Sequence, residues 1–172
     1  TTTTTTLPPT STLSPKTRCL ESLRQDGPAK CSGVNLTEMV FDRQKMNDSD
    51  FSEADLQGVS LYHKVLHRSD FSNADLSNAD LARSEFDYAD MRGVRLDGAD
   101  ATWASFQYAN LAGADFEGLA SNLGNLIGAN LEDANLSSVE FSTGANLTGV
   151  NLSGANLSDA RMVRLILRDA DL

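Results

Sequence analysis

Apolar residues return at every fifth position along most of this chain. In the stretch SDFSNADLSNADLAR, residues 69–83, they are Phe71, Leu76 and Leu81. An α-helix repeats its apolar face every 3.6 residues and a strand at every second residue, so neither element fits this pattern. The regularity indicates an internal repeat of five residues.

The repeat keeps its register over long distances. Its central position, which is apolar except at Ser121, falls at every fifth residue from Leu36 to Phe141, which makes 22 units. One extra residue follows, most simply Gly144, and the register then resumes at Leu147 and runs through 6 more units to Leu172. Ala dominates two positions before the centre and Asp or Asn directly before it, while turn-forming residues follow the centre. Each unit therefore offers one large and one small apolar residue, together with three that are mostly polar.

The units ADLSN, ADLQG, ANLAG, ANLED and ANLTG follow the motif A(D/N)LXX almost unchanged. The chain therefore resembles the pentapeptide repeat family over about four fifths of its length. This resemblance implies an all-β fold, a right-handed quadrilateral β-helix in which four units form one square coil. The central and the small residue would point inward, and residues 34–172 would form about seven coils.

A spacing of twenty residues supports the square coil independently. Bulky residues two places after a centre come in neighbouring pairs that recur at intervals of twenty: His63 and Arg68, Arg83 and Tyr88, Trp103 and Tyr108. In a coil of twenty residues such positions form columns. Phe residues at centres spaced by twenty should stack on adjacent coils in the same way, as in the pairs Phe51–Phe71 and Phe86–Phe106.

Two further regions precede the repeat. Residues 1–13 are rich in Thr and Pro, which favours a disordered linker because the segment has too little apolar surface to order itself. Residues 14–33 predict a short N-terminal capping α-helix and a loop over the first coil. Ser14 is typical of an N-cap, Pro15 of the first helical position, and the Gly-Pro pair at 27–28 of a helix end.

The predicted cap can attach to the coils in two ways. Leu20 and Leu23 form the apolar side of its helix and should cover the first coil. Cys19 and Cys31 are the only cysteines, and they could form a disulfide that ties the cap down or remain free thiols in a reducing compartment. Some members of the family that the chain resembles share this layout and are periplasmic or thylakoid-lumenal. We therefore expect a disulfide and an extracytoplasmic location.

Charge and composition argue against several classes of function. The net charge of −10 disfavours direct binding of nucleic acid, which needs Lys and Arg against the phosphates, and no run of 18 apolar residues predicts membrane insertion. No Ser/His/Asp set, phosphate-binding loop or Cys/His pair is discernible, so we expect neither enzyme activity nor a cofactor. His63 and His67 have the spacing of a zinc pair on a helix, but here they flank a turn without a third ligand, so no metal site is predicted.

The aromatic residues outside the Phe centres gather on two adjacent faces of the predicted coil. All three Tyr, the single Trp and both His stand one or two places after a centre. With two Arg they form a candidate binding site for a protein, the corner patch: Tyr62, His63, His67, Arg68, Arg83, Tyr88, Trp103 and Tyr108. Tyr, Trp and Arg are enriched at the centres of protein interfaces. The alternative is that these residues stack along the flank for stability alone.

Two functions are favoured, and a third alternative is a domain attached to a catalytic or membrane part outside this sequence. The first is a non-enzymatic structural or interaction module, a rigid rod that presents the corner patch to a protein partner. The second follows from the resemblance, since some bacterial family members are acidic rods that occupy the DNA site of gyrase, a type II topoisomerase, and protect it against quinolones. Residues 34–172 contain 22 acidic and 10 basic residues, a net charge of −12, which suits such a DNA mimic. Because the sequence stops inside a repeat, either the chain continues or its last coil docks against a second copy or another protein.

Overall fold

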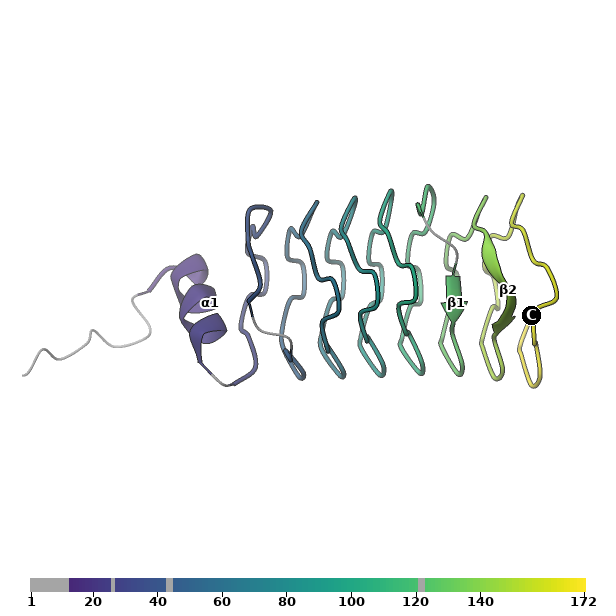
Figure 1. Ribbon diagram of the computed structural model, residues 1–172, viewed down its shortest axis with the longest axis horizontal. Coiled ribbons are helices and arrows are strands. Elements are labelled where there is room, and N and C mark those ends of the chain that lie inside the picture. The colour runs from purple at the N-terminus through teal and green to yellow at the C-terminus, as the bar shows by residue number, and fades with distance from the viewer. Residues whose placement is uncertain (1–12, 26, 43–44, 121–122) are drawn as a thin grey trace, which may run out of the picture.

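The chain folds into a rod of stacked coils (Figure 1). The helix α1 (Pro15–Arg24) lies at one end, and the C-terminus lies at the other. The computed structural model describes residues 13–25, 27–42, 45–120 and 123–172. The predicted linker, residues 1–13, lies outside these ranges apart from Leu13. Within the described ranges, no helix is both long and apolar enough to span a bilayer.

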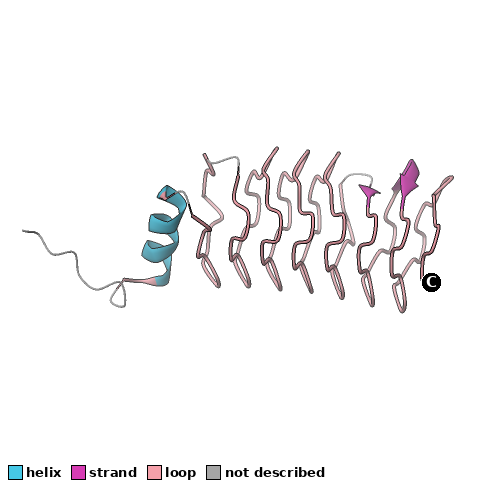
Figure 2. Ribbon diagram, turned by 90° about the horizontal axis from the view of Figure 1, so that it is seen from below, coloured by secondary structure: helices cyan, strands magenta, loops and turns pink. Residues whose placement is uncertain are grey.

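Successive coils pair through parallel bridges between residues that are twenty positions apart. Asp50 pairs with Asp70, and Asp70 in turn pairs with Asp90. Phe51 N donates to Asp70 O at 2.7 Å, and Asp70 N donates to Ser49 O at 2.8 Å. Because most bridges are isolated, the coils are drawn as loops in Figure 2, apart from β1 (Leu123–Asn125) and β2 (Phe141–Asn146). Four units therefore form one coil, and the fold is the predicted right-handed quadrilateral β-helix.

The extra residue in the repeat is accommodated at β1 and β2. These strands pair in parallel, but their register shifts along the pair. Earlier bridges join residues twenty apart, whereas Asn130 pairs with Asn151, which lies 21 positions later. Gly144 lies within β2 at φ +79°, a left-handed conformation that glycine adopts without steric cost. The predicted position of the insertion is therefore confirmed.

Each unit closes with a tight turn. Ala54 N donates to Phe51 O at 3.1 Å, and Glu53 between them has φ +56°. A left-handed third residue is the mark of a type II turn and favours Gly or Asn. Asp50 Oδ1 accepts from Ser52 N at 3.1 Å, and the same bond from the side chain before the centre to the backbone two residues later recurs along the rod. This bond explains why Asp or Asn precedes so many centres.

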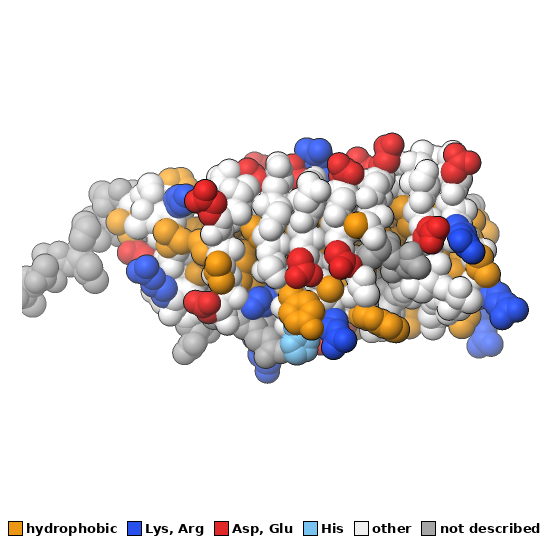
Figure 3. Space-filling model, turned by 45° about the horizontal axis from the view of Figure 1, so that its top comes forward, with side chains coloured by type: hydrophobic (Ala, Val, Ile, Leu, Met, Phe, Trp, Pro, Cys, Tyr) orange, Lys and Arg blue, Asp and Glu red, His pale blue; other side chains and the backbone are white. Residues whose placement is uncertain are grey.

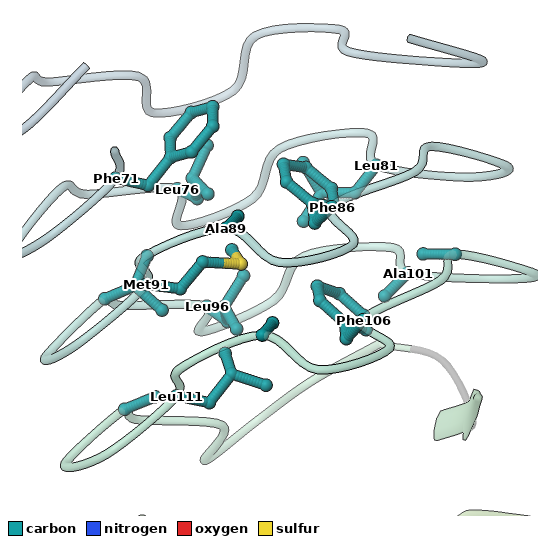
Figure 4. Close-up of a cluster of buried hydrophobic side chains, with 14 of the residues drawn as sticks. Phe71, Leu76, Leu81, Phe86, Ala89, Met91, Leu96, Ala101, Phe106 and Leu111 are labelled. Atoms are coloured by element: carbon teal, nitrogen blue, oxygen red, sulfur yellow. The ribbon is translucent and has the colours of Figure 1, made fainter. Parts of the chain in front are cut away.

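The central residues and the small residues fill the interior of the rod. All seven Phe side chains are buried. Phe86 stacks on Phe106 with ring centroids 5.4 Å apart and planes 6° apart, as Figure 4 shows, and Phe51 stacks on Phe71 at 5.1 Å. Both stacks follow from the spacing of twenty, as predicted. Because each coil buries its apolar faces only against its neighbours, stability depends on the coupling between coils.

The capping helix begins where the sequence predicts and ends earlier. Ser14 Oγ accepts from Thr17 N at 3.1 Å, and Pro15 is the first helical residue. The helix stops at Arg24, before the predicted stop at 27–28, because Gln25 already has an extended backbone. The helix therefore ends before the predicted Gly-Pro stop signal is reached.

The cap is attached to the first coil by covalent and apolar contacts. Cys19 and Cys31 are fully buried and form a disulfide with Cα atoms 4.6 Å apart, so the predicted bond is present. Leu23 packs against the core, and Leu20 and Leu23 line a cavity of about 190 Å³ beside the first coil. The bridge ladder starts at Lys30, four residues before the expected start of the coils.

The last coil carries exposed apolar side chains. The central residues Met162, Leu167 and Leu172 are 45%, 38% and 77% exposed, whereas the corresponding centres of earlier coils are buried. Docking of a second copy or another chain at this end stays a prediction.

Candidate functional site

The corner patch occupies two neighbouring columns on the flank of the rod. Bridges of twenty residues, such as Ser60–Asp80 and Glu85–Ser105, align the turns that carry the patch on successive coils. Figure 3 shows apolar and imidazole side chains close together in the middle of this flank, with carboxylates nearby. One column contains His63, Arg83 and Trp103, and the other contains Arg68, Tyr88 and Tyr108, while Tyr62 and His67 stand one position earlier in their turns.

Two tyrosines form a stack within the patch. The rings of Tyr88 and Tyr108 lie 5.0 Å apart between centroids, with planes 13° apart, and the residues are 60% and 50% exposed. The ring of Tyr108 also covers Gly128 in the next coil, where an added Cβ would overlap atoms of the ring. The stack is therefore held in a fixed orientation by the coil beneath it.

The cations of the patch are largely neutralised by carboxylates. Arg68 Nε and Nη2 donate to the two oxygens of Asp48 at 2.8 and 2.9 Å, and these hydrogen bonds lower the pKa of Asp48. His67 Nε2 lies 2.9 Å from Glu85 Oε2. Among the described residues, Arg83 makes no ion pair within 4.0 Å. The patch is thus mainly aromatic, and its predicted basic character is reduced to one exposed guanidinium.

Six patch residues occupy the left-handed position of their turns. His63, Arg68, Arg83, Tyr88, Trp103 and Tyr108 have φ between +55° and +62°. The same position in the other two columns is filled mainly by Gly, Asn or Asp, as in Gly58, Asn73 and Gly98. Large side chains are therefore concentrated where the backbone disfavours them.

Carboxylates form columns elsewhere on the rod. Asp50, Asp70 and Asp90 lie on three successive coils and are joined by bridges. Arg92 Nη2 donates to Asp90 Oδ2 at 2.6 Å, and its hydrogen bonds lower the pKa of Asp90. Among the described residues, no group of three or more His, Cys, Asp or Glu side chains is placed to hold a metal ion.

A groove of about 760 Å³ lies beside Trp103, over β1 and β2. It exists because Leu123, one coil after Trp103 in the same column, is buried in an extended strand and places no side chain over the indole. We call it the Trp103 groove. Sequence reasoning placed the insertion at Gly144, which lines this groove, but did not predict the cavity.

Solved structures of one protein share the fold of this chain. Solved structures of QnrB1, a plasmid-mediated fluoroquinolone resistance protein, are similar to the chain. Trypsin-treated QnrB1 gives a TM-score of 0.65 at 19% identity, over 82% of this chain and 81% of that chain. Full-length QnrB1 gives 0.53 at 20% identity, over 75% and 68%. A pentapeptide repeat protein from the Arabidopsis thaliana thylakoid lumen is 29% identical over 62% of this chain and 68% of that one, with a TM-score of 0.30.

The sequence itself matches a family model. No curated protein matches the chain. The model described as pentapeptide repeats matches eight copies, over residues 29–62, 65–100, 89–118 and 143–172, which together make up more than half of the chain. The coils, the turns and the inward-facing central residues of this chain are those that the repeat motif implies. The chain belongs to the pentapeptide repeat family.

Proposed function

We propose that this protein is a non-enzymatic scaffold that binds a protein partner through the corner patch. The observation that carries the proposal is the concentration of large, exposed side chains at left-handed positions on one corner. A non-glycine residue in this conformation costs about 1–2 kcal/mol. Strained positions of this kind persist where the surrounding fold enforces them and often mark binding sites.

Packing within the rod does not offset the cost at Trp103. This residue is 80% exposed, so its indole gains little from burial in the free protein. Burial of such a side chain in a partner would contribute about 1.5–3 kcal/mol. Tyr88 and Tyr108 gain about 0.5–1.5 kcal/mol from their mutual stack, and their outer faces remain available for contact. The patch fits an uncharged or weakly acidic partner surface with apolar pockets.

Affinity capture with matched variants tests the proposal. Trp103→Asn/Tyr108→Asn removes two rings and keeps a residue that tolerates the left-handed turn. Glu53→Asn/Asp133→Asn introduces the same residue at the same turn position of another column and serves as the control. We expect one specific protein to be retained by the wild type and the control and lost by the patch variant. Equal retention by all three would refute the role of the patch.

A second candidate is the acidic rod that binds a type II topoisomerase. It is favoured by the net charge of −12 over residues 34–172, by the column Asp50–Asp70–Asp90, and by the likeness in fold to QnrB1. Purified protein should then relieve quinolone inhibition of DNA supercoiling by gyrase. Asp50→Asn/Asp70→Asn should weaken the effect, whereas the patch variant should not. Absence of any effect on supercoiling would refute this candidate.

With the scaffold function we propose an extracytoplasmic location on the basis of the Cys19–Cys31 disulfide, because such bonds persist in oxidising compartments. This location argues against the second candidate, since gyrase is cytosolic. Alkylation of the denatured native protein with a thiol-reactive polyethylene glycol tests this. An oxidised pair leaves the mass unchanged until a reductant is added. Two reactive thiols without reductant would contradict the proposal.

A further inference from the structure

We propose that the Trp103 groove binds a neutral oligosaccharide, a function that goes beyond partner binding by the corner patch and shares only Trp103 with it. The first evidence is electrostatic. Every residue that lines the groove in the described part of the chain is uncharged, although 22% of the chain is Asp, Glu, Lys or Arg. A phosphorylated or carboxylated ligand would find no counter-charge there. The groove has a volume of about 760 Å³, which lies within the range of roughly 300–1,000 Å³ that is typical of small-molecule sites.

One wall of the groove is an aromatic surface. Trp103 is 80% exposed and is held at φ +61° by its turn, so the ring projects from the rod instead of packing on it. An indole is apolar on its faces, and the face of a pyranose ring that bears axial hydrogens is apolar too. Stacking of these two surfaces removes apolar area from water and leaves the sugar hydroxyls directed to the sides.

Hydroxyl and amide groups line the rest of the groove. Ser142 Oγ lies 3.5 Å from the position of an added Cβ on Gly124, which places this hydroxyl over the groove floor. Within the described ranges, the side chains of Ser142 and Thr143 make no hydrogen bond. Asn125 Nδ2 donates to Ser105 Oγ at 3.0 Å, which leaves its carbonyl oxygen able to accept. Such donors and acceptors match the hydroxyl groups of a sugar.

A peptide fits the groove less well than a sugar does. An extended peptide binds best when its backbone pairs with a free strand edge. The strands here are already paired along the rod, since Asn125 bridges to Ser105 on one side and Asn146 bridges to Ile166 on the other. Side chains therefore supply most of the polar groups that a ligand can reach.

Tryptophan fluorescence tests the proposal, because Trp103 is the single Trp of the chain. Cellotriose, maltotriose and N,N′,N″-triacetylchitotriose would each be titrated into the intact protein to millimolar concentration. We expect a saturable change in emission with at least one of them. Trigalacturonic acid, which has the same number of rings and is charged, should give a change at least about tenfold weaker at equal concentration.

Two matched variants assign the signal to the groove. Ser142→Leu fills the floor and removes the hydroxyl, so it should abolish the change in emission. Ser137→Leu makes the same substitution one position after a centre on another face and should leave the titration unchanged. The proposal is overturned if no trisaccharide alters the emission, if Ser142→Leu responds like the wild type, or if a neutral Gly-Ser-Thr peptide binds while the sugars do not. Ser142 lies outside the corner patch, so partner capture by this variant shows separately whether the proposed scaffold function holds.

Discussion

Substitution of Gly128 by Ala tests how firmly the tyrosine stack is held. The new Cβ would overlap the ring of Tyr108 and force it away from Tyr88. Gly113 is the matched control, because it has the same φ of +64° at the same turn position and no atom within 4 Å of an added Cβ. Both variants adopt a left-handed Ala, which costs about 1–2 kcal/mol and is partly offset by a less flexible unfolded chain, by about 0.4–1 kcal/mol. Gly113→Ala should therefore lower the free energy of unfolding by about 1 kcal/mol.

Gly128→Ala should cost more than its control because the stack is lost as well. A stacked aromatic pair contributes about 0.5–1.5 kcal/mol beyond its burial, so we expect a total of about 1.5–2.5 kcal/mol. Urea unfolding followed by far-UV circular dichroism measures the free energy of unfolding of both variants. The slope of this free energy against urea concentration should stay unchanged. The additional loss of unfolding free energy in Gly128→Ala should disappear in a Tyr108→Ala background. A double-mutant cycle measures this coupling between the two residues. Equal costs for the two glycine variants would refute the contact between Tyr108 and Gly128.

Three further predictions concern the core, the cap and the acidic columns. Phe86→Ala should cost about 3–5 kcal/mol in urea, whereas Trp103→Asn, at an 80% exposed position, should change stability little; similar costs would contradict the assigned burial. Cys19→Ser/Cys31→Ser should lower stability by about 2–3 kcal/mol in thermal unfolding, and an unchanged midpoint would show that the cap is held without the bond. The pKa of Asp90 is lowered in the folded state, so its contribution is present above the ordinary carboxyl pKa and is lost as the pH falls below it. Asp90→Asn should therefore lose less stability than the wild type between pH 7 and pH 3, as measured by urea midpoints.

The resemblance to the pentapeptide repeat family implied the coil, and the spacing of the repeat predicted the stacks and the insertion. The interval of twenty residues placed Phe86 over Phe106 and aligned Tyr88 with Tyr108, because a regular coil leaves little freedom for residues at the same phase. The cap was predictable for a different reason. Ser14 and Pro15 are local signals that do not depend on tertiary contacts.

Other features depend on contacts that the repeat does not determine. The pairing of Arg68 with Asp48 is a choice of rotamer between adjacent coils, although the opposite charges twenty residues apart were a usable signal. The Trp103 groove arises because Leu123 turns inward in an extended strand, which the pattern of centres does not show. The helix ends at Arg24 because Gln25 has an extended backbone, and the chain therefore leaves the helix before the Gly-Pro pair is reached.

In the square coil, the direction in which a side chain faces depends on the number of residues that precede it along the coils. A deletion of five residues between Tyr88 and Tyr108 would rotate everything beyond it by a quarter of a turn, so the two rings would face different directions. A deletion of twenty residues would shorten the rod and leave that phase intact. The single extra residue at Gly144 causes no such rotation, because the bulge within β2 takes up its length and later bridges resume the original alignment. Insertions and deletions in this protein therefore act as rotations of the surface unless they come in whole coils or are contained in a bulge.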